Sequence, residues 1–155
     1  MHRILALDMS TKNIGYTFAL GEEYLFGGSV ELQGDLLDTR LTMATRWLNA
    51  VMEDMQPTVV AIEEPWPHRG NHRVDRMLAR ACGHAEAVAR LHDAQVVLVH
   101  PSTVKATTFS KDRIRHTARA IGKTTITGHE ADSVGIWHAT LGVLQSERFE
   151  EQANE

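Results

Sequence analysis

Short runs of consecutive apolar residues mark the strands that the sequence predicts. Residues 4–7 form such a run, which ends in Asp8 before a turn-prone segment. Residues 14–20 and 24–30 are rich in β-branched and aromatic residues, and a Gly-Glu-Glu triplet separates them. A short polar connection between two such runs is typical of a hairpin. The opening of the chain is therefore predicted to form three successive strands.

Helical spacing follows Gly34. Apolar residues recur there at intervals of 4, 3, 4, 3 and 4, and they are Leu37, Leu41, Ala44, Leu48, Val51 and Met55. We expect Asp35 to be the N-cap of this helix and Pro57 to end it. The next apolar run, residues 58–62, predicts a strand that ends at Glu63. A loop with two prolines and a glycine comes next, and helical spacing returns over residues 73–92.

The last third of the chain predicts one more strand and a closing helix. Residues 95–99 form a short apolar strand, whereas residues 101–109 fit neither period. Residues 111–121 are expected to be helical, residues 122–128 to be a loop, and residues 129–144 to be the final helix. The resulting order, β-β-β-α-β-α-β-α, predicts an α/β fold: a mixed five-stranded sheet with its first three strands antiparallel and helices on both faces. We expect a single domain over residues 1–146 and a polar tail that frays over residues 147–155.

Composition narrows the protein class. The chain has 155 residues, of which 43% are hydrophobic and 23% charged, which is ordinary for one folded domain. Its one cysteine, Cys82, excludes a disulfide framework within the chain and is expected to be a small buried apolar residue. No apolar run approaches the ~20 residues of a membrane span, and the start lacks a signal peptide. We therefore expect no membrane contact and a cytoplasmic location, in a bacterial cell or a virus-infected host.

The charge is unevenly distributed. The net charge of −4 divides into −6 over residues 1–64, +7 over residues 65–128 and −5 over residues 129–155. A basic middle between acidic ends is compatible with an anionic partner that the net charge would conceal.

Two carboxylates lie at strand ends. Asp8 and Glu63 each follow a buried run, and in open α/β sheets sites form beyond the carboxyl ends of strands. His129 and Asp132 are three residues apart, so they share a face at the start of the last helix. Oxygen and nitrogen ligands from separate segments suit hard divalent cations, and a pair of such ions about 4 Å apart can clamp a phosphodiester. The alternative is that each acid only caps a strand or helix. Glu130 is about 200° around the helix from Asp132 and is expected to be solvated.

The ordered set of motifs resembles the RuvC-type Holliday junction resolvases, which have an RNase H-like fold. The motifs are Ile4-Leu5-Ala6-Leu7-Asp8 followed by Gly15-Tyr16, then Ala61-Ile62-Glu63, then His129-Glu130-Ala131-Asp132 before an apolar helix. The resemblance implies catalytic and metal-binding positions at Asp8, Glu63, His129 and Asp132, with two Mg²⁺ per active site and Mn²⁺ as a substitute. It also implies a homodimer that resolves a four-way DNA junction by paired symmetrical nicks.

His129 departs from the family pattern, which most often has an acid at this position. Three carboxylates against two Mg²⁺ would leave the site at +1, but a neutral imidazole is a competent ligand or proton shuttle. We therefore expect activity to fall as the pH drops through the ordinary histidine pKa of ~6.5, and Mn²⁺ to work at least as well as Mg²⁺.

Further residues are candidates for DNA contact. Four arginines are spaced 4, 3 and 4 apart and would form one helical stripe: Arg69, Arg73, Arg76 and Arg80. The alternative for this stripe is an ordinary solvated helix face. The resemblance places Lys105 and Lys111 near lysines that the family uses on DNA, and Trp66 at an aromatic position that meets unstacked bases. The alternative for Trp66 is a ring folded back on the core.

Three other functions stay open. An actin-like or sugar-kinase-like ATPase also has a strand-ending aspartate, but Met9-Ser10-Thr11 lacks the glycine of its phosphate loop. A non-catalytic junction-binding relative would explain His129 as a decayed site. A related nuclease could act on an RNA–DNA hybrid, a linear duplex or another branched DNA. The sequence identifies no branch-migration partner.

Overall fold

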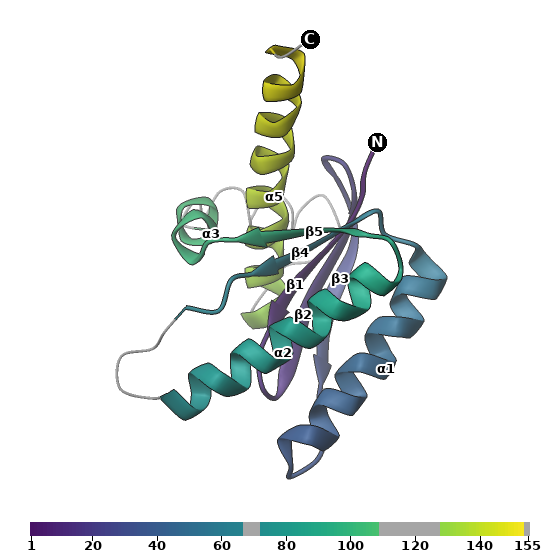
Figure 1. Ribbon diagram of the computed structural model, residues 1–155, viewed down its shortest axis with the longest axis vertical. Helices are drawn as coiled ribbons and strands as arrows, with labels where there is room; N and C mark the ends of the chain where they lie inside the picture. Colours follow the sequence, from purple (N-terminus) through teal and green to yellow (C-terminus); the bar gives the residue numbers. More distant parts are fainter. Residues whose placement is uncertain (67–71, 109–127, 154–155) are drawn as a thin grey trace.

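The computed structural model describes residues 1–66, 72–108 and 128–153, and its centre is a five-stranded sheet (Figure 1). The strands are β1 (Arg3–Met9), β2 (Asn13–Leu20), β3 (Glu23–Glu31), β4 (Val59–Glu63) and β5 (Gln95–Val99), in the order β3-β2-β1-β4-β5. β1, β2 and β3 pair antiparallel, whereas β4 pairs parallel with both β1 and β5. The predicted mixed sheet is therefore confirmed.

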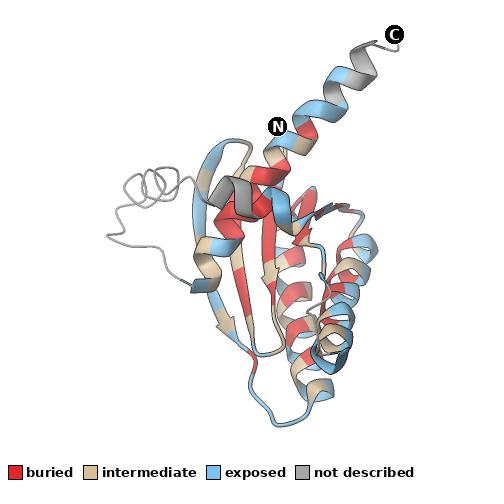
Figure 2. Ribbon diagram, turned by 90° about the vertical axis from the view of Figure 1, so that its left-hand side faces the viewer, coloured by how far each residue is buried: buried red, intermediate tan, exposed pale blue. Residues whose placement is uncertain are grey.

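Helices cover both faces of the sheet, as expected. α1 (Leu37–Met55) and α2 (His72–Leu91) pack on one face, and α5 (Gly128–Ala153) packs on the other together with α3 (Pro101–Thr108). β1 contributes to both cores, because successive side chains of a strand point to opposite faces. Leu5 and Leu7 join the core under α1 and α2, whereas Ile4 and Ala6 join the core under α5. Figure 2 shows the buried residues concentrated between the layers.

The helices differ from the prediction in several places. The N-cap of α1 is Leu36, which makes no side-chain capping bond, so the assignment of Asp35 was wrong. Residues 101–108, which fit neither period, form α3. α5 extends to Ala153 rather than stopping near 144, because the Glu, Gln, Arg and Ala residues there are good helix formers without an apolar stripe.

The helix expected over residues 111–121 lies outside the described residues. Gly128, the expected end of a loop, is instead the first residue of α5. None of the helices that the structure describes is long and apolar enough to span a membrane.

Candidate active site

The two strand-end carboxylates lie side by side on adjacent strands. Leu7 of β1 pairs with Ile62 of β4, so Asp8 and Glu63 occupy the next position on each strand. Leu7 and Ile62 both belong to the core under α1 and α2. Because side chains alternate along a strand, Asp8 and Glu63 are on the opposite face, the one that α5 covers.

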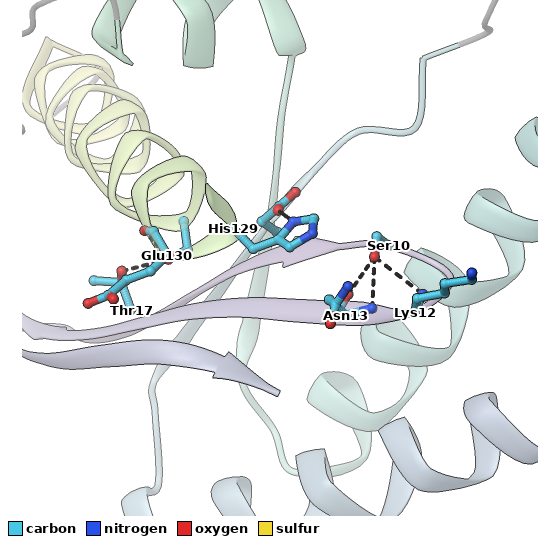
Figure 3. A network of polar contacts seen from close by, with 8 residues as sticks. Ser10, Lys12, Asn13, Thr17, His129 and Glu130 are labelled. Atoms are coloured by element: carbon cyan, nitrogen blue, oxygen red, sulfur yellow. Dashed lines mark hydrogen bonds and ion pairs between the residues drawn. The ribbon is translucent and has the colours of Figure 1, made fainter. Parts of the chain in front are cut away.

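The first turn of α5 brings the other two predicted residues to Asp8. Nδ1 of His129 contacts a carboxylate oxygen of Asp8 directly, and Figure 3 shows His129 beside the strand ends. Potential ligand atoms of Asp8, His129 and Asp132 all lie within 4.8 Å of one another. Among the described residues, this is the one group of three or more potential metal-ligating side chains. Glu63 is adjacent by strand register but outside the group.

The environment of Asp8 disfavours an uncompensated charge. Its side chain is 13% exposed. Burial is the main cause that raises the pKa of Asp8 above its ordinary value of 3.8; the hydrogen bond and charge of His129 act against this, and the nearby Asp132 adds to it. A desolvated carboxylate beside a second, exposed one favours a bound cation, because the cation stabilises the ionised forms.

A glycine allows α5 to approach this closely. Gly15 lies opposite Asp8 in the β1–β2 register. A Cβ atom at Gly15 would lie 2.0 Å from the carbonyl oxygen of His129 and 2.4 Å from its carbonyl carbon. The missing side chain at Gly15 therefore leaves the space in which the first turn of α5 lies against the end of β1.

Buried hydroxyls hold α5 on the sheet behind the site. Thr17 of β2 and Ser133 of α5 are fully buried, and their hydroxyls are 2.8 Å apart. Ser133 also donates to the backbone carbonyl of Glu130 at 2.8 Å, and the hydroxyl of Tyr24 on β3 donates to the Glu130 carboxylate at 3.2 Å. Glu130 is thus partly buried and bonded to β3, so the expectation that it would be solvated was wrong.

The turn after Asp8 is also fixed by side-chain bonds. The Ser10 hydroxyl accepts hydrogen bonds from the backbone N–H groups of Lys12 and Asn13, at 3.3 and 2.9 Å, and donates to the Asn13 carbonyl at 2.8 Å (Figure 3). Ser10 therefore stabilises the connection that joins the carboxyl end of β1 to β2.

Cys82 packs below the strand ends. Its Sγ lies 3.9 Å from the carbonyl oxygen of Glu63. Burial, followed by the charges of Asp8, Glu63 and Glu86, raises the pKa of the thiol to about 12. The side chain is therefore a neutral, buried thiol, as expected.

Trp66 is a surface residue. It is 57% exposed, which excludes the alternative in which the ring is folded into the core. Its ring meets that of His100 in an edge-on arrangement, with centroids 4.8 Å apart and planes at 79°.

The predicted arginine stripe is only partly described. Arg73, Arg76 and Arg80 are exposed on α2. Arg80 is ion-paired with Asp38 of α1 at 2.8 Å, so it leans toward α1. Arg69 and Lys111 lie outside the described residues, and so does the side chain of Lys105 in α3. A DNA-binding role for all of these residues stays a prediction.

Sequence-based reasoning missed the residues that position α5. Thr17 carried a usable signal, because it is a polar residue within a buried apolar strand. Gly15 belonged to a recognised motif, but its role depends on a contact with α5 that no local pattern indicates. Tyr24 carried no signal.

Comparisons with known proteins find similarity in structure alone. No protein-family model and no curated protein sequence matches the chain. Among solved structures, the RuvC of T. thermophilus in complex with a Holliday junction substrate is 19% identical, with a TM-score of 0.75 over 90% of this chain and 92% of that one. Another Thermus thermophilus RuvC structure is 20% identical, with a TM-score of 0.70 over 90% and 96% of the two chains.

A third similar structure comes from a eukaryote. The yeast mitochondrial Holliday junction resolvase Ydc2 is 14% identical, with a TM-score of 0.65 over 90% of this chain and 78% of that one. At these identities the similarity establishes the fold: the chain has the RNase H-like fold of RuvC, as the motifs predicted.

Proposed function

We propose that this chain is a divalent-metal-dependent endonuclease that resolves four-way DNA junctions by paired symmetrical nicks. The observation that carries the proposal is the convergence of Asp8, His129 and Asp132 at the carboxyl end of β1. Glu63 adjoins this group on the next strand. The shared fold with RuvC and Ydc2, which are resolvases, supports four-way junctions as the substrate.

The residues present fit a hard divalent cation. Asp8 and Asp132 offer carboxylate oxygens, which suit Mg²⁺ and Mn²⁺, and His129 offers a nitrogen that suits Mn²⁺ better. Burial raises the pKa of Asp8 despite the opposing hydrogen bond and charge of His129, and a bound cation would stabilise its ionised form. Two bound ions would supply activation of a water nucleophile and stabilisation of the leaving oxygen.

His129 has a second task that follows from its contact with Asp8. When Asp8 is ionised, its carboxylate oxygen can only accept a hydrogen bond, so Nδ1 of His129 is the donor. In the neutral form of the ring the lone pair is then on Nε2. The imidazole therefore orients the Asp8 carboxylate and presents Nε2 as a proton acceptor or ligand. This replaces the acid that the family most often has at this position.

The described surface residues suit a DNA substrate. The exposed ring of Trp66 can stack on an unpaired base near the branch point, and Arg73 and Arg76 can contact phosphates. Two symmetrical nicks require two active sites, so we propose that the protein acts as a homodimer.

The test is a cleavage assay with four substrates and two variants. The wild-type chain is incubated with a four-way junction, another branched DNA, a linear duplex and an RNA–DNA hybrid, in Mg²⁺, Mn²⁺ or chelator. Asp8→Asn removes a proposed ligand charge, and Asp54→Asn makes the same change on the exposed surface of α1. We expect paired symmetrical nicks in the junction, lost with Asp8→Asn or chelator and kept with Asp54→Asn.

Other outcomes would contradict the proposal in distinct ways. Metal-dependent cutting of the hybrid, the duplex or another branched DNA in preference to the junction would keep the site and refute the substrate. Junction binding without cutting would indicate a non-catalytic relative. Nicks that appear singly, in separate binding events, would contradict the homodimer.

A further inference from the structure

The ring of Trp66 rests on a second ring that has no assigned role. Trp66 follows β4, and His100 follows β5 directly. The backbone N–H of Glu64 donates to the carbonyl of Val99 at 2.9 Å, so the β4–β5 pairing extends beyond the end of β4. Trp66 and His100 therefore lie at the same carboxyl edge of the sheet as Asp8 and Glu63.

His100 is itself held in place. Its Nδ1 accepts the backbone N–H of Ser102 at 3.2 Å and lies 2.7 Å from the Ser102 hydroxyl. Its backbone carbonyl accepts the N–H groups of Thr103 and Val104, at 2.9 and 3.2 Å. His100 thus caps the N-terminus of α3, which packs against α5 through Val104. Because a backbone N–H can only donate, Nδ1 carries the lone pair and the proton of the neutral ring is on Nε2.

This arrangement gives a large exposed ring one fixed neighbour. An exposed tryptophan in a loop would ordinarily sample several rotamers, and ordering it on binding would weaken the interaction. An edge-on contact between aromatic rings favours one orientation, and His100 cannot rotate freely without losing its bonds to Ser102. More than half of the Trp66 side chain stays available for a partner.

We propose that His100 is a positioning residue: its ring holds Trp66 in the orientation in which the indole stacks on an unpaired nucleobase of the DNA substrate. The proposal rests on the proposed function, since it requires unpaired bases near the site. It adds a specific residue that the family motifs do not contain, and it separates two tasks of His100, capping α3 and supporting Trp66.

Two substitutions separate these tasks. His100→Asn keeps an oxygen that can cap α3, and asparagine is among the best N-cap residues, but it removes the ring. His100→Phe keeps a ring beside Trp66 and removes the capping acceptor. If His100 only caps α3, the phenylalanine variant should lose function and the asparagine variant should keep it. If His100 positions Trp66, the order is reversed.

The first measurement uses the free protein. Acrylamide quenching of Trp66 fluorescence is obtained as the difference between each protein and the same protein with Trp66→Phe. We expect His100→Asn to make Trp66 more accessible to quencher, and His100→Phe to leave it near the wild-type value. Unchanged quenching in His100→Asn would overturn the proposal, whatever the protein cuts.

The second measurement uses a four-way junction with 2-aminopurine at the branch point, bound to Asp8→Asn protein so that it is not cut. We expect His100→Asn to reduce the change in 2-aminopurine fluorescence on binding. In protein that keeps Asp8 and cuts the junction, we expect His100→Asn to lower kcat about three- to tenfold, which corresponds to the free energy of an aromatic pair contact. The melting temperature of His100→Asn should stay at the wild-type value, and that of His100→Phe should fall.

The results distinguish the two proposals. If the wild-type protein does not cut junctions but His100→Asn still frees Trp66, the function is refuted and the contact stands. If the wild-type protein cuts junctions and His100→Asn matches it in both fluorescence and kcat, the positioning role is refuted. A loss in His100→Phe together with wild-type quenching and kcat in His100→Asn would show that the cap, and not the ring, is what matters, and would overturn the proposal.

Discussion

A methyl group at Gly15 should separate α5 from the sheet and disable the site without altering any proposed ligand. Gly15 lies opposite Asp8, and its added Cβ would be 2.0 Å from the carbonyl oxygen of His129. Gly15 is not among the glycines with positive φ, so alanine fits its backbone conformation and the effect is steric. The three atoms that clash are the carbonyl oxygen, the carbonyl carbon and the Cβ of His129, so no side-chain rotation relieves the contact.

The size of the effect follows from these distances. Ordinary van der Waals contacts of a Cβ atom begin at 3.4 Å, so the first turn of α5 must move by more than about 1 Å. Metal ligands tolerate only ~0.2 Å. Displacements of about 1 Å in a catalytic constellation cost on the order of 10²-fold in rate. Overpacking of this kind destabilises by about 1–3 kcal/mol, which for a chain of this length lowers the melting temperature by roughly 3–10 °C.

Three measurements on Gly15→Ala test this reasoning: Mn²⁺ affinity by calorimetry, junction nicking, and thermal unfolding. Gly142→Ala is the matched control, because it makes the same change in α5 where an added Cβ meets no atom within 4 Å. The control should keep metal affinity and nicking, and should be stabilised by about 0.5–1 kcal/mol. If Gly15→Ala binds Mn²⁺ and nicks junctions like the control, the close approach of α5 does not build the site.

Three further predictions concern the carboxylate, the buried hydroxyls and the arginines. Burial raises the pKa of Asp8 in the folded state above its ordinary value of 3.8. The protonated Asp8 carboxyl therefore favours folding below pH 3.8, and this stabilisation is lost as the pH rises through the folded-state pKa. Metal-free Asp8→Asn should therefore melt above the wild type at pH 7, with a gap that narrows toward pH 4; a lower melting temperature at pH 7 would contradict this. Thr17→Val should destabilise the fold by about 1–2 kcal/mol, since it leaves the buried Ser133 hydroxyl without its Thr17 partner. Scanning calorimetry measures this loss, and a value below ~0.3 kcal/mol would contradict the prediction. Arg76→Ala should lower the slope of log K against log salt for junction binding by about one, and Arg80→Ala by less, because α1 already pairs with Arg80. Equal slopes for the two variants would refute that difference.

The fold could be predicted because its central strands, β1 and β4, are buried on both faces. Residues 4–7 and 59–62 are uninterrupted apolar runs, and such runs indicate interior strands of an α/β sheet. The order of elements then restricted the topology, since parallel strands need helical crossovers. Residues 101–109 had no clear period, because only Val104 of α3 is a buried apolar side chain among the residues whose burial the structure describes.

The candidate site was predictable to the extent that strand alternation and helix spacing determine it. Asp8 and Glu63 could be assigned to the same edge of the sheet because each ends a buried run, and the structure adds the register that puts them side by side. The spacing of three between His129 and Asp132 placed both on one face of a helix. What no periodic pattern contains is the pairing between distant elements. The bonds of Glu130 to Tyr24 and of Thr17 to Ser133, and the contact of Trp66 with His100, became visible only once the chain was folded.

The same distinction explains how a chain about 20% identical to RuvC can keep the same fold. The proposed ligands need only a few fixed features of this chain: two adjacent parallel strands, one helix N-terminus, and a glycine where they meet. The apolar residues between these features can change while their burial is preserved, since cores tolerate substitution that keeps volume and pattern. The imidazole of His129, at the start of α5, reaches the Asp8 carboxylate directly, so the proposed site accommodates a histidine where the family most often has an acid. The proposed site depends on the close approach of α5 to the sheet, and Gly15 tests that approach without changing any proposed ligand.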